Sequence, residues 1–226
     1  MRLKLAGRWK FARSLELTGL GLAVAMGVAL AQAPASPDLK LRGDRFQPLS
    51  YDQLTPEQKA FVDQVLSEKV SLVGPYNILL RNPALGRTVH DFSVQVRFHS
   101  SLPTKLNELS IMMAARFWNS PFVWMAHRRA GETAGLSPAI ADAIAAGTRP
   151  ASMAPDEEMI YNFANELLTT RQVSDATYQA VAGKFGEKGV VDLIGQMGYF
   201  QYLSMMLNVD RYPMPPGVKS ELKPLP

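Results

Sequence analysis

Few residues in this sequence can do acid–base or nucleophilic chemistry. The 226 residues include three histidines and no cysteine. Without a thiol the chain has no disulfide, no thiolate nucleophile, no CxxC redox pair and no cysteine-based zinc site. Proton transfer by a histidine beside a carboxylate is therefore the first chemistry to consider, and Glu108 with His127 is the pair whose spacing suits it.

Glu108 and His127 lie on two expected helices joined by a tight turn. Glu108 precedes Trp118 by ten residues, or roughly 15 Å of helix, and His127 follows Pro121 by six, or roughly 9 Å. Antiparallel packing would bring the carboxylate and the imidazole to comparable depth. A carboxylate in that position orients the ring and favours its charged form, which makes a proton relay. The alternatives are a buried structural pair, or two side chains that do not meet.

The other histidines are expected to have plainer roles. His90 and His99 lie within and at the end of the same expected helix, and both are interpreted as surface or capping residues, because the helix dipole favours histidine near a C-terminus. The candidates for a substrate-binding wall near His127 are Trp124, Phe122, Tyr76, Asn77 and Arg81.

Two arginines are candidates for binding a substrate carboxylate. Arg81 or Arg128 would do so through a bidentate contact, and the alternative for each is an ordinary solvated arginine. Trp124 lies three residues before His127 and so shares its helical face, where a large aromatic side chain can equally belong to the core.

No metal and no cofactor are expected from the motifs. One glutamate and one histidine fall short of the three or four ligands that a metal site needs. The sequence has no glycine-rich phosphate loop and no GxSxG nucleophile elbow. The motifs therefore give no indication of a bound metal or cofactor.

The elements that must position these residues are predicted to be helices. Thr55, Pro56 and Gln58 form a capping-box pattern, and no segment alternates apolar and polar residues with period two. Seven or eight helices and essentially no sheet are expected, which makes an all-α fold. Further helix starts are expected after Pro103 and at Asn82-Pro83, Ser120-Pro121, Ser137-Pro138, Pro155 and Ser174-Asp175.

Two helices carry more specific expectations. In the helix that starts at Pro83, Leu85, Val89, Phe92 and Val96 recur at spacings of four, three and four, which predicts one buried face. The helix that starts at Ser174-Asp175 is expected to be separated by Gly186 or Gly189 from a last helix over residues 190–208.

The N-terminal segment reads as a secretory signal peptide, residues 1–31. Five basic residues precede a 15-residue apolar stretch that ends in Ala29-Leu30-Ala31. Cleavage would leave 19 basic and 19 acidic residues, so the formal charge of +4 belongs to the signal and nucleic acid is not an expected partner. A periplasmic or secreted protein without membrane association is expected; the alternative is an uncleaved anchor. Residues 32–54 are interpreted as an extended leader, 55–210 as one helical domain and 211–226 as a proline-rich tail.

The stretch from Gly74 to Gly147 resembles the core of the carboxymuconolactone decarboxylase family, which also contains the AhpD-like alkylhydroperoxidases. Its elements are a GPxN turn before an NP-opened helix, a Leu-Pro before an E-L helix, W-x-x-H ending at His127, and A-G-L-S before an alanine-rich helix. Their order and spacing carry the likeness, which extends more weakly to Asn208.

This resemblance implies an all-α, AhpD-like helical bundle that assembles into trimers or hexamers. In the peroxidase branch a glutamate is followed by a CxxC pair and a histidine; Glu108 and His127 occupy the glutamate and histidine places, and Ser120 and Val123 occupy those of the cysteines. Disulfide-based peroxide reduction is therefore excluded. Ser120 is interpreted as the N-cap of the following helix rather than as a nucleophile.

The function expected from the resemblance is that of an exported carboxymuconolactone-decarboxylase-like enzyme. It would act by cofactor-free proton transfer, in a decarboxylation or an isomerisation, on a small organic acid or lactone, with Glu108 and His127 as the catalytic pair. The alternative is a non-catalytic, homo-oligomeric protein that binds small molecules on the same scaffold.

Overall fold

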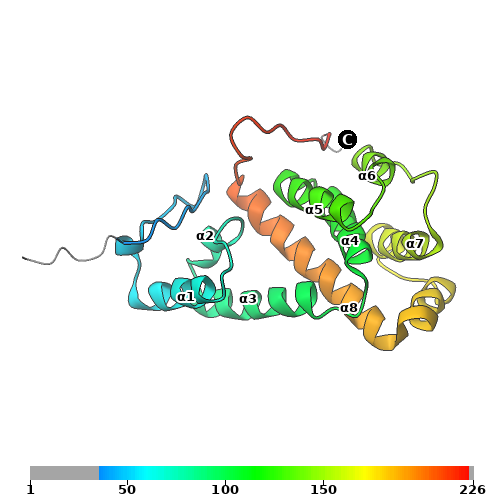
Figure 1. Ribbon diagram of the computed structural model, residues 1–226, viewed down its shortest axis with the longest axis horizontal. Coiled ribbons are helices and arrows are strands. Elements are labelled where there is room, and N and C mark those ends of the chain that lie inside the picture. Colours follow the sequence, from blue (N-terminus) through cyan, green and yellow to red (C-terminus); the bar gives the residue numbers. More distant parts are fainter. Residues whose placement is uncertain (1–35, 224–226) are drawn as a thin grey trace, which may run out of the picture. The chain divides into compact units, whose positions relative to one another are not determined.

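The computed structural model describes residues 36–223. The predicted signal peptide, residues 1–31, lies outside these residues. Within them every regular element is a helix, so the expected all-α fold is confirmed (Figure 1). No helix among residues 36–223 combines the length and the apolar character needed to cross a membrane.

Eight α-helices follow a 3-10 turn at Tyr51–Gln53. They are α1 Pro56–Ser67, α2 Tyr76–Leu79, α3 Pro83–Phe98, α4 Thr104–Phe117, α5 Pro121–Thr133, α6 Pro138–Ala145, α7 Pro155–Thr170 and α8 Asp175–Asp210. The short α2 was not expected from the sequence.

Proline and capping residues begin most of these helices where the sequence predicts. Five of them, α1, α3, α5, α6 and α7, have proline in the first position, where the missing amide proton costs nothing. The capping box at α1 is confirmed, because the Thr55 hydroxyl accepts from the Gln58 amide and the Gln58 side chain accepts from the Thr55 amide. Local signals thus determine where most helices begin.

The core is built around α4, which packs against α5, α6, α7 and α8 (Figure 1). Its buried side chains include Leu106, Leu109 and Met112, which belong to the same hydrophobic core as Met197 and Phe200 of α8. On the other side of the fold α3 contacts α1, α2 and α8. Because α4 is enclosed from several directions, it is the most suitable helix to hold a carboxylate away from water.

The expected buried face of α3 is partly wrong. Val89 and Val96 are buried, but Leu85 and Phe92 are 45% and 43% exposed. The face that α3 turns inward instead includes Gly86 and His90. At Gly86 a Cβ atom would lie 2.8 Å from the ring of Phe61, so this position lets α1 approach closely.

The predicted break near Gly186 is confirmed. Gly186 has φ 69° and ψ 174° in the middle of α8, a backbone conformation that strongly favours glycine. The chain therefore changes direction there and continues as a long helix to Asp210. This C-terminal part supplies one wall of the site described next.

Candidate functional site

The hairpin of α4 and α5 brings Glu108 and His127 together. Asn119 takes the turn between the helices with φ 46°, a conformation that asparagine tolerates better than most residues. Glu108 Oε2 lies 2.7 Å from His127 Nδ1, and only 14% and 11% of the two side chains are exposed. The carboxylate therefore fixes the ring through Nδ1 and leaves Nε2 as the nitrogen available to a ligand.

His127 lines a pocket of about 410 Å³. Phe200 of α8 packs edge-on against the imidazole, with ring centroids 4.5 Å apart. Glu108 is not part of the lining, so it lies behind the ring that it orients. Most of the pocket wall is apolar or aromatic; it includes Val70, Val73, Phe98, Phe122, Val123, Ala126, Tyr199, Phe200, Leu203 and Leu207.

The charged side chains of the pocket wall are Lys69, Arg97 and, when protonated, His127. No aspartate or glutamate lines the pocket. Among the ion pairs of residues 36–223, none involves Lys69 or Arg97. The pocket thus combines an apolar wall with two cations that no carboxylate of the described chain neutralises.

Two of the five predicted wall residues are in the pocket. Tyr76 and Phe122 line it, and burial raises the pKa of the Tyr76 phenol, which therefore stays neutral. Lys69, Arg97 and Tyr199 also line it but were not expected. Lys69 belongs to the turn after α1, where the sequence has no motif that would point to a site. Arg97 lies in the last turn of α3, where the helix dipole favours a basic residue whatever its function.

The other three predicted wall residues were placed wrongly. Asn77 is fully buried and its amide donates to the Phe46 carbonyl, while Arg81 donates to the Gln47 carbonyl. The Trp124 indole is core, and its Nε1 donates to Glu221 in the tail. The physical reason is shared: each side chain is hydrogen-bonded to a segment outside the helical domain.

Arg128 is not a substrate-binding residue in this structure. Its guanidinium contacts Glu132, Asp142 and Glu221 at 2.9, 2.7 and 2.7 Å. Burial alone would lower the arginine pKa, but hydrogen bonds to the three carboxylates outweigh it and raise the pKa further. Arg128 is therefore occupied in holding the tail against α5 and α6.

The interpretation of His90 as a surface or capping residue is wrong. The side chain is 1% exposed, and both nitrogens are engaged: Nδ1 lies 2.8 Å from the Tyr76 hydroxyl and Nε2 lies 2.7 Å from Glu68 Oε2. His99, in contrast, is exposed at the C-terminus of α3 as expected.

Comparisons with solved structures identify the fold. An uncharacterised peroxidase-related protein from Ralstonia eutropha, described as an alkylhydroperoxidase AhpD core, superposes with a TM-score of 0.58 at 15% identity, over 76% of this chain and 92% of its own. A protein of unknown function from Agrobacterium tumefaciens that has been related to the antioxidant defence protein AhpD gives 0.53 at 13% identity, over 62% and 96%. The chain has the AhpD-like fold. No family model and no curated protein matches its sequence.

This chain has no cysteine for the redox chemistry of AhpD-like peroxidases. Val123 lines the pocket, whereas Ser120 is buried with no hydrogen-bond partner for Oγ within the described residues. Ser120 lies at the N-cap position of α5, but its hydroxyl accepts no hydrogen bond from the first turn of the helix. The N-cap interpretation is therefore correct for the position and wrong for the hydrogen bond.

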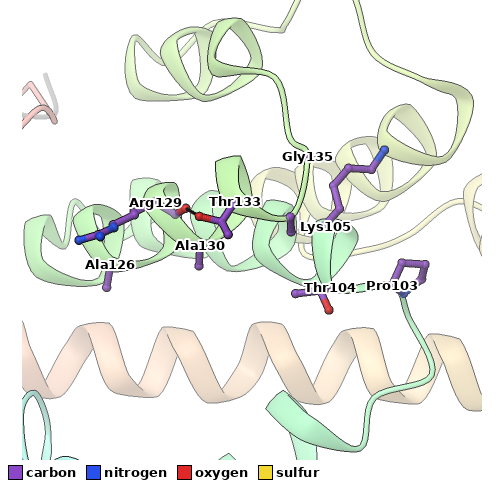
Figure 2. A pocket seen from close by; sticks show the side chains of 9 residues that line it. Pro103, Thr104, Lys105, Ala126, Arg129, Ala130, Thr133 and Gly135 are labelled. Atoms are coloured by element: carbon purple, nitrogen blue, oxygen red, sulfur yellow. Dashed lines mark hydrogen bonds between the residues drawn. The ribbon is translucent and has the colours of Figure 1, made fainter.

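A second hollow, an open groove of about 1010 Å³, runs along α5 and the start of α4 (Figure 2). Figure 2 shows Ala126, Ala130 and Thr104 directed to the same side of these helices. Ala126 lines both the pocket and the groove, so the two hollows meet there. The groove wall is mostly small side chains, and its Lys105 is already paired with Glu157 at 2.8 Å. The pocket at His127 is therefore the better candidate site.

The described residues offer no metal centre. Among residues 36–223, no three histidine, aspartate or glutamate side chains are grouped so that they could hold an ion. The chemistry available in the pocket is that of the imidazole, the phenols, the two cations and the hydroxyl groups of Ser71 and Ser93.

Proposed function

We propose that this protein is an exported enzyme, similar to carboxymuconolactone decarboxylases, that transfers a proton on a small organic acid or lactone without a cofactor. The observation that carries the proposal is the Glu108–His127 pair at the wall of an apolar pocket. A histidine held at 2.7 Å by a poorly solvated carboxylate has the arrangement of a general acid–base group.

His127 would exchange the proton through Nε2. In an isomerisation, it takes a proton from a carbon next to a carbonyl group and returns it at another position. In a decarboxylation, the bond between the substrate and its carboxylate breaks and carbon dioxide leaves. The electron pair of that bond stays on the substrate carbon, which then takes the proton of the imidazolium. Glu108 keeps the ring in place and balances its charge in both cases.

Lys69 and Arg97 support an anionic substrate. They share the pocket with His127, and no acidic side chain of the lining competes for them. A charged hydrogen bond to a carboxylate would orient the substrate, while the aromatic and aliphatic wall would bury its apolar part. This assignment replaces Arg81 and Arg128 as the expected carboxylate-binding residues.

The absence of cysteine separates this proposal from the peroxidase descriptions of the structural neighbours. A thiol peroxidase needs a thiolate to attack peroxide and a second thiol to resolve the product. Neither can come from this chain. Proton transfer uses only groups that the pocket contains.

The test uses protein recovered from the periplasm after expression of the full chain. Intact mass reports whether cleavage occurred after Ala31. The purified protein is then screened by thermal shift against butenolides and aromatic or aliphatic acids, each compared with its neutral amide or ester.

For each compound that stabilises the protein, NMR in D2O measures deuterium incorporation and carbon dioxide release. Exchange or turnover of a carboxylated compound is the expected result. Binding with no exchange and no turnover would instead identify a non-catalytic small-molecule-binding protein.

A further inference from the structure

The buried His90 connects the pocket to the surface of the molecule. Its Nδ1 meets the hydroxyl of Tyr76, which lines the pocket, and its Nε2 meets Glu68, whose side chain is 40% exposed. The three residues come from the start of α2, the middle of α3 and the end of α1. Two consecutive hydrogen bonds thus link the partly exposed Glu68 to Tyr76 in the pocket wall.

The electrostatics set the direction of these hydrogen bonds at neutral pH. The hydrogen bond from His90 lowers the pKa of Glu68, so the outer end of the chain is a carboxylate. Burial raises the pKa of Tyr76, so the inner end is a neutral phenol. The carboxylate can only accept, so His90 Nε2–H donates to Glu68; in the neutral ring Nδ1 then carries no proton and accepts from the Tyr76 hydroxyl.

We propose that Tyr76 is a second acid–base residue of the pocket, and that His90 and Glu68 form the path by which its proton reaches solvent. The proposal rests on the proton-transfer function assigned to Glu108 and His127. It adds a group that works on the same substrate from a different element. With two such groups one can accept a proton while the other donates one, which adds a two-base route to the single-base isomerisation described for His127.

The transfer balances without any other reactant. A substrate proton passes to the phenol oxygen as the phenol proton passes to His90 Nδ1 and the Nε2 proton passes to Glu68. The substrate keeps the electron pair of the broken bond, and the neutral Glu68 carboxyl releases its proton to water. The reverse sequence delivers a proton to the substrate. In this scheme Tyr76 is the catalytic residue, and His90 and Glu68 act through it.

The alternative is that the three residues only tie α1, α2 and α3 together. Stability alone does not separate the two roles, because loss of a buried hydrogen bond destabilises in both cases. The informative variants leave the fold intact: Tyr76→Phe keeps the ring in the wall, and Glu68→Gln changes an exposed position. Tyr51→Phe is the matched control, since the Tyr51 hydroxyl bonds Asp63 and lies outside the pocket.

The first measurement needs no substrate. With tyrosine labelled at Cζ with carbon-13, NMR follows the Tyr76 signal, assigned by Tyr76→Phe, while the pH is lowered through the range below 4.5 in which Glu68 takes up a proton. Glu68→Gln should abolish the step in this signal. That variant retains the other titratable groups near the chain, which are His90, His127, Lys69, Arg97 and Tyr199. A Tyr76 signal that does not respond to Glu68 would overturn the proposal.

The second measurement uses the acid or lactone found by the D2O screen. Tyr76→Phe should lower kcat at least tenfold and leave KM within a factor of three of the wild-type value. Glu68→Gln should lower kcat less and change the pH profile of kcat. The control Tyr51→Phe should match the wild type. Wild-type kcat in Tyr76→Phe would refute the second acid–base residue and leave His127 in its role. If the wild type turns over no compound of the screen, the proposed function fails, and the catalytic role of Tyr76 fails with it.

Discussion

At the residue scale, the surroundings of each histidine decide what it can do. His127 is held at one nitrogen by Glu108 and faces the pocket with the other side of its ring. His90 is held at both nitrogens, so it can only pass a proton between its partners. His99 is exposed and has neither arrangement. The three histidines therefore differ in the proton transfers that their surroundings allow.

The proposed catalytic role of Glu108 and His127 predicts graded losses of activity. His127→Ala should lower deuterium exchange or turnover by about 100-fold or more while the fold stays intact, which is the usual contribution of a general acid–base group. Glu108→Gln should cause a smaller loss, because the amide still orients the ring but no longer balances its charge. His99→Ala is the control. Unchanged rates in His127→Ala, with the melting temperature lowered, would show that the pair is structural.

Lys69 and Arg97, which form no ion pair with other residues of 36–223, predict a specific effect on binding. Arg97→Gln should weaken the affinity for a carboxylated ligand by about 10- to 100-fold, in line with the loss of about 1.5 to 3 kcal/mol for a charged hydrogen bond. The affinity for the corresponding amide should change little. Calorimetry on the variant and on Arg87→Gln, a control on the same helix outside the pocket lining, measures the difference. Equal losses for acid and amide would contradict recognition by charge.

The sequence predicts the Glu108–His127 contact from two signals: both residues lie on helices that flank one turn, and they occupy the glutamate and histidine places of the family motif. It does not predict Lys69 or Arg97, since they reach the pocket only through the packing of α3 and of the turn after α1. The burial of His90 was missed for the same reason: its partners Glu68 and Tyr76 lie 22 and 14 residues away. Contacts between separate helices depend on tertiary packing, which spacing along one helix does not reveal.

At the element scale, helix starts were predictable and helix faces were less so. A proline after a capping residue is a local signal for a helix start, and the start of α1 agrees with expectation. A glycine within a helical stretch is a local signal for a break, and the break at Gly186 agrees as well. The inward face of α3 depends on its neighbours. These leave Leu85 and Phe92 partly exposed although their spacing is regular, because α3 turns Gly86 and His90 toward α1 instead.

The link between α8 and the turn before α4 predicts a pH-dependent stability. Asp192 accepts hydrogen bonds from the amide and hydroxyl of Ser101 at 2.8 and 2.6 Å and from Lys188 at 2.6 Å. Burial alone would raise the pKa of Asp192, but these hydrogen bonds outweigh it and lower the pKa. Asp192→Asn should therefore reduce the free energy of unfolding by about 1 to 2 kcal/mol at pH 7.

The sign of the pH effect follows from the lowered pKa. A carboxylate with a lowered folded-state pKa stabilises fully above its ordinary value, here 3.8, and loses that contribution as the pH falls through the folded value. The gap between the wild type and Asp192→Asn should thus be full at neutral pH and narrow in acid. Urea unfolding at several pH values measures it, with the exposed Asp91→Asn as control. A gap that does not depend on pH would rule out the charge as its origin.

At the scale of the whole molecule, the segments before and after the helical domain pack onto it. Arg42 donates to the carbonyl groups of Pro213 and Met214, and Asp210 accepts from the Phe46 amide at 2.8 Å. Glu221 in the tail contacts Trp124 and Arg128 of α5. Composition predicts extended segments here, and it does not predict their attachment, because the partners are separated by up to 172 residues.

The outer face of α8 predicts self-association. Val191, Ile194, Met205 and Val209 are 66%, 49%, 38% and 55% exposed, and their spacings of three, eleven and four residues place them along one side of the helix. Single exposed apolar residues are common, whereas several on one side of a helix, here two pairs separated by eleven residues, are typical of an interaction surface. A neutral mature chain would add little repulsion between copies.

Light scattering of the cleaved protein at micromolar concentration should therefore give a mass of at least two chains, and three or six are the numbers that the resemblance implies. Replacing Val191 and Ile194 together by aspartate should shift the protein toward the monomer without loss of helical circular dichroism, because two charges would have to be buried in the interface. Val218→Asp in the tail, a comparably exposed apolar position, should leave the mass unchanged. A wild-type mass of one chain would contradict the expectation, and an unchanged mass in the double variant would move the interface away from α8.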